Sequence, residues 1–250
     1  KKNWQKLSEK RQAIFRDYNS AVRIKVLSAI PWRVWGEKKR HRTCPQIIES
    51  IYYCVERAED RFKKFKKQIK EGKEDKSSSS LFAIAREIEE VFSIPPSIKQ
   101  KRELLSEYLL TGLDSLESYR KLIKLGIKPG EAIFVVPRAV KIDILQEYDL
   151  YNLLIGYYPL RLCQTAEEEM RRNTIREVAQ IKKELDKKGY GWLGRLIVPK
   201  CGLTGFCPEE TSCPMIFSQV PKYNQKFHKS MKEELNRLFE KNLKNLGKNL

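Results

Sequence analysis

Two short segments of the chain carry the residue types that bind anions. Arg40, His41 and Arg42 form the first, and the second runs from Leu160 to Arg171. Both are expected to open helices, where backbone N–H groups favour an anion and arginine adds charge-assisted hydrogen bonds. If the two helix starts face each other, they form a pocket for a phosphate or a nucleotide. The alternative for the first segment is a solvated basic surface.

Cysteines form a second group that could do chemistry. The four in the second half of the chain are Cys163, Cys201, Cys207 and Cys213. Four thiolates can hold zinc or an iron–sulfur cluster. Their spacing differs from the usual knuckle with two intervening residues, so two disulfides or free buried thiols remain alternatives. Cys44 and Cys54 lie on an expected helix and are assigned to the core.

Basic charge is concentrated at the two ends of the chain. Of the net charge of +18, residues 1–76 contribute +12 and residues 222–250 contribute +5, whereas residues 77–221 are nearly neutral. Charge runs are usually solvated faces, but two basic ends on a neutral body favour a polyanionic partner. The lysines expected to bind RNA are Lys38, Lys39, Lys63, Lys64, Lys66, Lys67, Lys241 and Lys244.

The overall composition is that of a globular protein, with 41% hydrophobic and 33% charged residues. No apolar run approaches the roughly 20 residues that a membrane-spanning helix needs, and no signal peptide is visible. We therefore expect a cytoplasmic protein. The abundance of Lys, Glu and Ile, with only three Met, is typical of a thermophile.

Periodicity and helix breakers predict a helix-dominated α+β fold with a small sheet. A basic helix is expected over 1–30 and another over 222–250, on either side of a domain over 31–221. Composition marks a linker at 71–80 and a cysteine loop at 199–216 within that domain. Helices are predicted at 43–70, 81–92, 98–125, 142–157 and 163–188, and buried strands at 132–137 and 195–198.

The two anion-binding segments resemble motifs of the FAD-dependent thymidylate synthases, the ThyX family. Arg40-His41-Arg42 matches the start of the signature R-H-R-x-x-S-x-x-x-x-S-x-R, and Ser50 matches its second serine. The family segment L-R-L-x-x-x-A-x-x-E-x-R matches Leu160 to Arg171. The resemblance covers about residues 32–216 and includes the cysteine loop, which looks like a variant found in some members.

The resemblance implies a ThyX-like fold and a homotetramer that binds FAD, takes hydride from NADPH and methylates dUMP with methylenetetrahydrofolate. Arg161 would contact the dUMP pyrimidine and stabilise its negative charge, which makes it the catalytic candidate. Arg40, His41 and Arg42 would border the flavin, and Ser50 would lie near the dUMP phosphate.

Three residues of the family pattern are replaced in this chain. Pro45 stands for the first signature serine, Tyr52 for the terminal signature arginine, and Ile133 for another substrate-binding arginine. Loss of one charge-assisted phosphate contact costs roughly 1.5–3 kcal/mol, or about ten- to a hundredfold in affinity. Arg57 and Arg138 are the candidates to replace the missing charge.

Two functions follow from these observations. The eroded signature and the basic ends favour a ThyX-like scaffold that acts as an RNA-binding component of a ribonucleoprotein, associated with the ribosome. The alternative is an active thymidylate synthase that is homo-oligomeric and takes dUMP as substrate. Steeply salt-dependent RNA binding would favour the first function, and bound flavin would favour the second.

Overall fold

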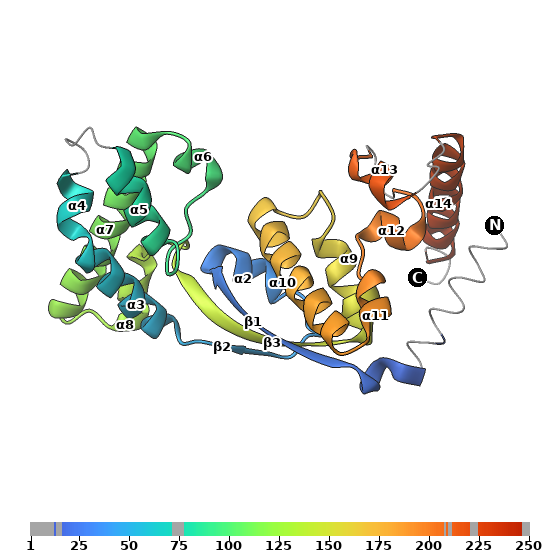
Figure 1. The fold of residues 1–250 in the computed structure, drawn as a ribbon, viewed down its shortest axis with the longest axis horizontal. Coiled ribbons are helices and arrows are strands. Elements are labelled where there is room, and N and C mark those ends of the chain that lie inside the picture. The colour runs from blue at the N-terminus through green and yellow to red at the C-terminus, as the bar shows by residue number, and fades with distance from the viewer. Residues whose placement is uncertain are drawn as a thin grey trace. The chain divides into compact units, whose positions relative to one another are not determined.

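The computed structural model describes residues 13, 17–71, 78–207, 209, 212–220 and 225–246. Within them, helices dominate and one small sheet is present, which confirms the predicted α+β class (Figure 1). The chain forms two compact units. Unit 1 comprises residues 1–24 and 148–250, and unit 2 comprises residues 25–147.

The sheet has three strands in the order β1-β3-β2, with β1 at Arg23–Pro31, β2 at Gln46–Ile48 and β3 at Lys141–Asp149. β2 runs antiparallel to β3, and Ile47 lies opposite Leu145. Every second residue of β3 is buried, as expected for a strand with one face on a core.

All three strands lie in segments that are predicted to be helical, and those predictions are wrong at the strands. Residues 23–30 belong to β1 instead of the helix expected over 1–30, whose residues 1–12 lie outside the described part of the chain. Residues 142–149 belong to β3 instead of the helix expected over 142–157. The physical reason is the spacing of the buried residues, which alternate along both strands with period two.

The two strands predicted from apolar runs are also wrong. Residues 132–137 contain the end of α8 (Pro129–Ala132) and a 3-10 turn, η2 (Ile133–Val135). Phe134 in this turn is 87% exposed, so the run does not lie in a core. Arg195 ends α11 (Gly191–Arg195), and an irregular segment follows it.

Unit 2 contains a bundle in which α3, α4, α5 and α7 pack together (Figure 1). Its helices are α2 (Trp32–Lys38), α3 (Ile51–Lys64), α4 (Lys66–Glu71), α5 (Ser78–Ile88), α6 (Pro96–Lys99), α7 (Arg102–Lys124) and α8. Gly112 of α7 permits close packing, because a Cβ there would lie 3.1 Å from the ring of Phe62. The helix predicted at 43–70 begins only at Ile51, because Gln46–Ile48 pairs with β3.

Unit 1 contains a 3-10 turn, η1 (Asn19–Ala21), a π-helix, η3 (Asn152–Gly156), and several α-helices. These are α9 (Tyr158–Arg161), α10 (Glu168–Lys187), α11, α12 (Lys200–Thr204), α13 (Met215–Gln219) and α14 (Gln225–Leu246). The predicted helix stop at Gly189 is confirmed by its φ of +79°, which favours glycine. The predicted C-terminal helix is confirmed as α14.

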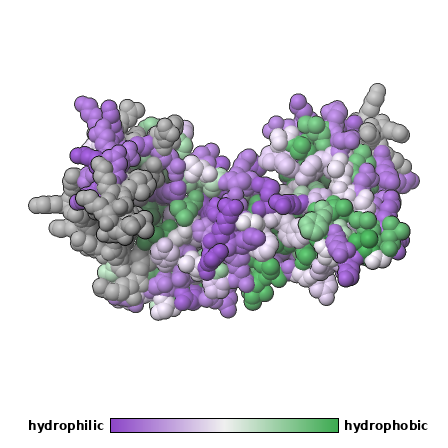
Figure 2. All heavy atoms as spheres, turned by 180° about the vertical axis from the view of Figure 1, so that it is seen from behind, coloured by the Kyte–Doolittle hydropathy of each residue, from purple (hydrophilic) through white to green (hydrophobic). Residues whose placement is uncertain are grey.

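Hydrophilic and hydrophobic side chains alternate over the face of the molecule drawn in Figure 2. In the part of the chain that the structure describes, every helix is too short or too polar to cross a membrane.

Candidate functional site

Arg40, His41 and Arg42 lie in a turn between α2 and β2, so the prediction that they open a helix is wrong. Backbone hydrogen bonds hold the turn. The amide of His41 donates to the carbonyl of Lys38 at 3.1 Å, and the amide of Cys44 donates to that of His41 at 3.2 Å. Arg40 and Arg42 are exposed, and His41 is half-buried. The turn belongs to unit 2.

Ser50 is the N-terminal flanking residue of α3. Its hydroxyl makes no capping hydrogen bond to the helix, and the residue is exposed. Its carbonyl accepts from both the amide and the thiol of Cys54, each at 3.2 Å. Burial and the nearby charge of Glu49 raise the pKa of Cys54 to about 12, so this thiol is a structural donor and not a nucleophile.

Arg57 of α3 is held inside unit 2 by two carboxylates. Its guanidinium lies 2.9 Å from Glu49 Oε2 and 3.0 Å from Asp143 Oδ2, and it also donates to the carbonyl of Lys141. Glu49 accepts in addition from the amide of Asp143 at 3.0 Å. Because these contacts join α3 to β3, Arg57 acts as a structural clamp and is not available to replace a missing phosphate ligand. Arg138 is exposed and remains a candidate to replace the missing phosphate ligand.

Arg161 is the last residue of the short helix α9 in unit 1, so the prediction that it opens a long helix is wrong. α10 starts later, at Glu168, and the side chain of Glu167 caps it by accepting from the amide of Met170 at 2.9 Å. The π-helix η3 precedes α9. Gly156 is required there, because a Cβ would lie 2.4 Å from the ring of Tyr151. Single π-turns are frequent next to functional residues.

Three buried tyrosines hold α9 in place. The rings of Tyr148, Tyr157 and Tyr158 pack with centroids 4.8–5.1 Å apart. Tyr158 donates to the buried carboxylate of Glu177 on α10 at 3.3 Å. Burial raises the pKa of Tyr148 and Tyr158 well above the usual value, so both stay protonated and able to donate. Sequence reasoning missed this cluster, although consecutive tyrosines just before Arg161 were a visible signal.

Arg171 of α10 belongs to the same motif as Arg161 and carries a buried Nε without a hydrogen-bond partner among the described residues. Buried donors are usually satisfied, so this one could donate to a bound acceptor. In unit 2, the indole Nε1 of Trp35 on α2 is also buried and has no hydrogen-bond partner among the described residues.

Most of the lysines predicted to bind RNA are buried or already interact with another side chain, which limits their availability to RNA. Lys38 is fully buried, and Lys39 lies 4.8 Å from the centroid of the Trp35 ring. Lys63, Lys64 and Lys66 pair with Asp60, Glu87 and Glu117 at 3.5, 3.8 and 2.6 Å. Lys67 and Lys241 are exposed, and the side chain of Lys244 lies outside the described part. RNA binding by these lysines stays a prediction.

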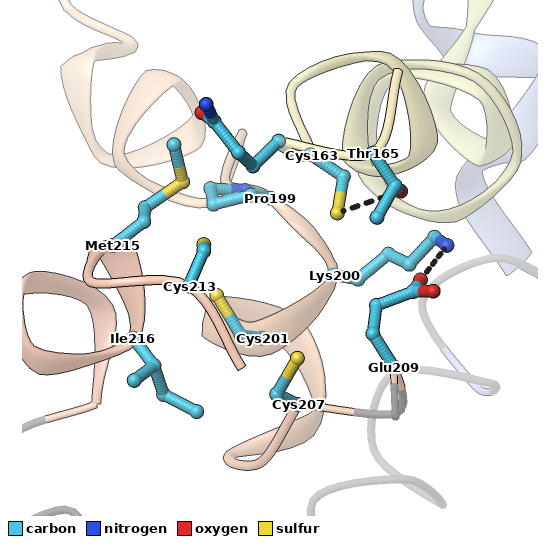
Figure 3. Close-up of a pocket in the computed structure, with 11 residues that line it drawn as sticks. Cys163, Thr165, Pro199, Lys200, Cys201, Cys207, Glu209, Cys213, Met215 and Ile216 are labelled. Atoms are coloured by element: carbon cyan, nitrogen blue, oxygen red, sulfur yellow. Dashed lines mark hydrogen bonds and ion pairs between the residues drawn. The ribbon is translucent and has the colours of Figure 1, made fainter. Parts of the chain in front are cut away.

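The four cysteines of the second group line one pocket in unit 1 (Figure 3). Cys163 follows α9, Cys201 lies on α12, and Cys207 and Cys213 lie between α12 and α13. All four are free thiols, and the pocket between them has a volume of about 180 Å³. Among the described residues, no three His, Cys, Asp or Glu side chains are close enough to hold one metal ion. Burial raises the pKa of Cys201, and the other three thiols add to that effect.

A sequence profile described as "Thymidylate synthase complementing protein" (Thy1) matches residues 20–185. The flavin-dependent thymidylate synthase of Pyrococcus abyssi is 32% identical over 127 residues, which cover 51% of each chain. That of Pyrococcus horikoshii is 36% identical over 128 residues, which cover 51% of this chain and 52% of the relative. The chain thus spans about half the length of the curated relatives it matches.

Two solved structures align with the chain at lower identity. ThyX from Helicobacter pylori, complexed with FAD and dUMP, aligns with a TM-score of 0.48 and 16% identity, over 76% of this chain and 84% of that one. PolB from Streptomyces cacaoi, a UMP/dUMP methylase bound with 5-Br dUMP, aligns with a TM-score of 0.46 and 13% identity, over 76% of this chain and 82% of that one.

Proposed function

Because this chain belongs to the thymidylate synthase complementing protein family, we propose that it is a flavin-dependent thymidylate synthase that binds FAD and dUMP. The observation that carries the proposal is the family match over residues 20–185. It includes both anion-binding segments, at Arg40–Arg42 and at Leu160–Arg171. The relatives that this chain matches are flavin-dependent thymidylate synthases.

In this proposal Arg161 is the residue that stabilises negative charge on the dUMP pyrimidine. A guanidinium offers a rigid fork of donors to an anionic ring, and its charge is permanent. The buried tyrosine cluster and the bond from Tyr158 to Glu177 fix the helix that carries Arg161. Preorganised donors of this kind lower the cost of charge that develops during the reaction.

The unpaired Nε of Arg171 supports a ligand in the same segment, because a bound acceptor would satisfy it. In unit 2, Arg40, His41 and Arg42 would border FAD, and the exposed hydroxyl of Ser50 would be available to a phosphate. FAD, when bound, would supply the hydride chemistry. Arg138 is the proposed replacement for the arginine that the family has at the position of Tyr52.

The first test is the flavin content of the purified 250-residue chain. Flavin released by denaturation should fluoresce in stoichiometric amount, and calorimetry should show dUMP binding. The Arg161→Ala variant should bind dUMP about ten- to a hundredfold more weakly, the cost of one charge-assisted contact. Arg171→Ala should weaken binding by a smaller factor. Arg176→Ala, an exposed arginine on the same helix, is the matched control.

Production of dTMP from dUMP, methylenetetrahydrofolate and NADPH is the second measurement. Flavin binding without dTMP would reduce the proposal to a flavin-binding scaffold. A chain without flavin or dUMP affinity would contradict it.

The RNA-binding component is the second candidate function, and its support lies in the C-terminal region. Residues 222–250 carry a charge of +5, and Lys229 and Lys241 are exposed on α14. A basic exposed helix favours a polyanion by releasing counterions. Sedimentation with ribosomal particles that is lost at high salt would support this candidate.

A further inference from the structure

We propose that Cys163, Cys201, Cys207 and Cys213, here called the cysteine pocket, bind a four-iron iron–sulfur cluster. This inference does not rest on the proposed thymidylate synthase activity. The profile match ends at residue 185, before three of the four cysteines. All four thiols belong to unit 1 and line a single pocket.

The backbone around the cysteine pocket is shaped to bring distant thiols together. α12 ends at Gly205, whose φ of +77° turns the chain, and the amide of Gly205 donates to the carbonyl of Cys201 at 2.8 Å. The Thr204 hydroxyl contacts the carbonyls of Lys200 and Phe206 at 2.9 and 2.6 Å. These bonds return the chain toward α12, so that the Cys207 sulfur faces the same pocket as that of Cys201 (Figure 3).

The cysteine pocket suits a cluster with its own inorganic core better than a single ion. Zn–S bonds of about 2.3 Å in a tetrahedron bring four sulfurs to within roughly 4 Å of one another. Among the described residues no group of three His, Cys, Asp or Glu side chains could hold a single metal ion, and the pocket that the four thiols line has a volume of about 180 Å³. In an iron–sulfur cubane each cysteine binds a different iron, so the ligand sulfurs stand farther apart and surround the inorganic core.

The remaining walls of the pocket suit a cluster as well. Pro199, Met215 and Ile216 supply apolar surface, and the ion pair between Lys200 and Glu209 lies at the edge (Figure 3). The Thr165 hydroxyl lies 3.3 Å from Cys163 Sγ, and hydrogen bonds to ligand sulfurs are one means by which proteins tune such clusters. Cys213 is followed by Pro214, as the last cysteine is in ferredoxin-type runs.

Binding is a ligand exchange at iron. Each of the four thiols loses its proton to solvent and forms one Fe–S bond, while the iron releases the thiol or solvent ligand that it carried before. No electron moves in this step. The cluster is supplied preformed, either during expression or as a synthetic four-iron cluster that carries small thiolate ligands, so that ligand exchange alone accounts for binding.

The test is the iron and acid-labile sulfide content of the 250-residue chain, purified without oxygen and reconstituted. We expect about four irons and about four sulfides per chain. An electron paramagnetic resonance signal should appear when the cluster is reduced with dithionite. Cys213→Ala and Cys163→Ala change half-buried residues, and each should lower iron and sulfide at least fivefold. Cys44→Ala, which removes a buried thiol of unit 2, should change neither. Circular dichroism checks that each variant is folded.

Three results would overturn the proposal. One zinc per chain without sulfide would make the pocket a single-ion site. Loss of four titratable thiols in the denatured, unreduced chain would make it a pair of disulfides. Iron and sulfide that persist in both folded pocket variants would place any cluster elsewhere.

Discussion

The charged cluster on α3 in unit 2 and the cysteine pocket in unit 1 differ in how their polar groups are satisfied. On α3, Arg57 pairs with Glu49 and Asp143, and Glu59 pairs with Arg120 of α7. In the cysteine pocket, four free thiols line a shared volume. The ion pairs of the first cluster join secondary-structure elements, although Arg57 Nε and Glu59 Oε1 have no partner among the described residues. The thiols of the second line a pocket.

This difference teaches that residue type alone does not identify a binding site. Charged side chains on α3 follow the family signature directly in the chain, because α3 begins at Ile51, yet much of their hydrogen-bonding capacity is used within the protein. Ion pairs of this kind hold structure, and their removal is expected to cost stability. Removal of groups that line an open volume is expected to weaken ligand binding and to change the free energy of unfolding only slightly.

Arg120→Ala should give the largest loss of stability. It leaves the carboxylate of Glu59, which is 3% exposed, without its charged partner at 2.5 Å. Breaking a buried pair costs several kcal/mol, and since Arg120 is partly exposed we expect about 2–3 kcal/mol at pH 7. Urea unfolding measures this value. A loss below about 0.5 kcal/mol would show that the pair is dispensable.

The same variant should depend on pH in a defined direction. Burial raises the pKa of Glu59, and Arg120 opposes that effect. A carboxyl whose folded pKa is raised contributes stability below its unfolded pKa and loses it as pH rises through the folded pKa. Removing Arg120 raises the pKa further, so the loss should shrink as pH falls from 7 toward 5. Adding Glu59→Gln to the variant should abolish this pH dependence.

Arg57→Ala should destabilise the chain by a smaller amount, about 1–2 kcal/mol, because its side chain is 36% exposed and solvent screens the pair. The variant removes the ion pairs that join α3 to β3 and leaves the carboxylates of Glu49 and Asp143 without the guanidinium between them. Arg138→Ala is the matched control and should lie within about 0.5 kcal/mol of the parent. If Arg57→Ala instead weakens dUMP binding without loss of stability, Arg57 is a ligand and the comparison fails at this residue.

Thr165→Val should act on the cysteine pocket with a still smaller effect on stability. The change removes the hydroxyl 3.3 Å from Cys163 Sγ and keeps the shape of the side chain. Loss of a hydrogen bond to a ligand sulfur destabilises the more negative, reduced cluster, so the reduction potential should become more negative. A redox titration followed by electron paramagnetic resonance measures it, and the iron content should stay at the parent level. An unchanged potential would place the hydroxyl away from the cluster.

The sequence predicted the helical class, the C-terminal helix and the stop at Gly189, because these depend on local signals. It did not predict β1, β2 or β3. Gln146 is a polar residue that is nevertheless buried in β3. The alternation of Ile142 and Ile144 is also compatible with part of a helix. The apolar run at 132–137 misled for the opposite reason, since Phe134 is exposed and apolar character alone does not establish burial.

For the candidate site, the sequence located Arg161 and the four cysteines but not what surrounds them. The thiols of Cys163 and Cys201 are far apart in the chain, and only the folded structure shows that they share a pocket. The role of Arg57 as a clamp depends on Asp143 in a strand that was predicted to be helical. Long-range pairing of this kind has no local signature.

Replacing Lys63, Lys64, Lys66 and Lys67 with Gln should have the smallest effect. Three of these lysines already pair with exposed or half-buried carboxylates of unit 2, so RNA would have to compete with those carboxylates for them. We expect less than a twofold change in affinity for a labelled RNA, and a salt dependence like that of the parent. Lys229→Gln with Lys241→Gln, on exposed positions of α14, is the comparison variant. A flatter salt slope in the α3 variant alone would mean that its ion pairs open to bind RNA, and the contrast between the paired charges on α3 and the cysteine pocket would then be wrong. If the parent chain binds no RNA, RNA binding is excluded for both the α3 lysines and the α14 lysines.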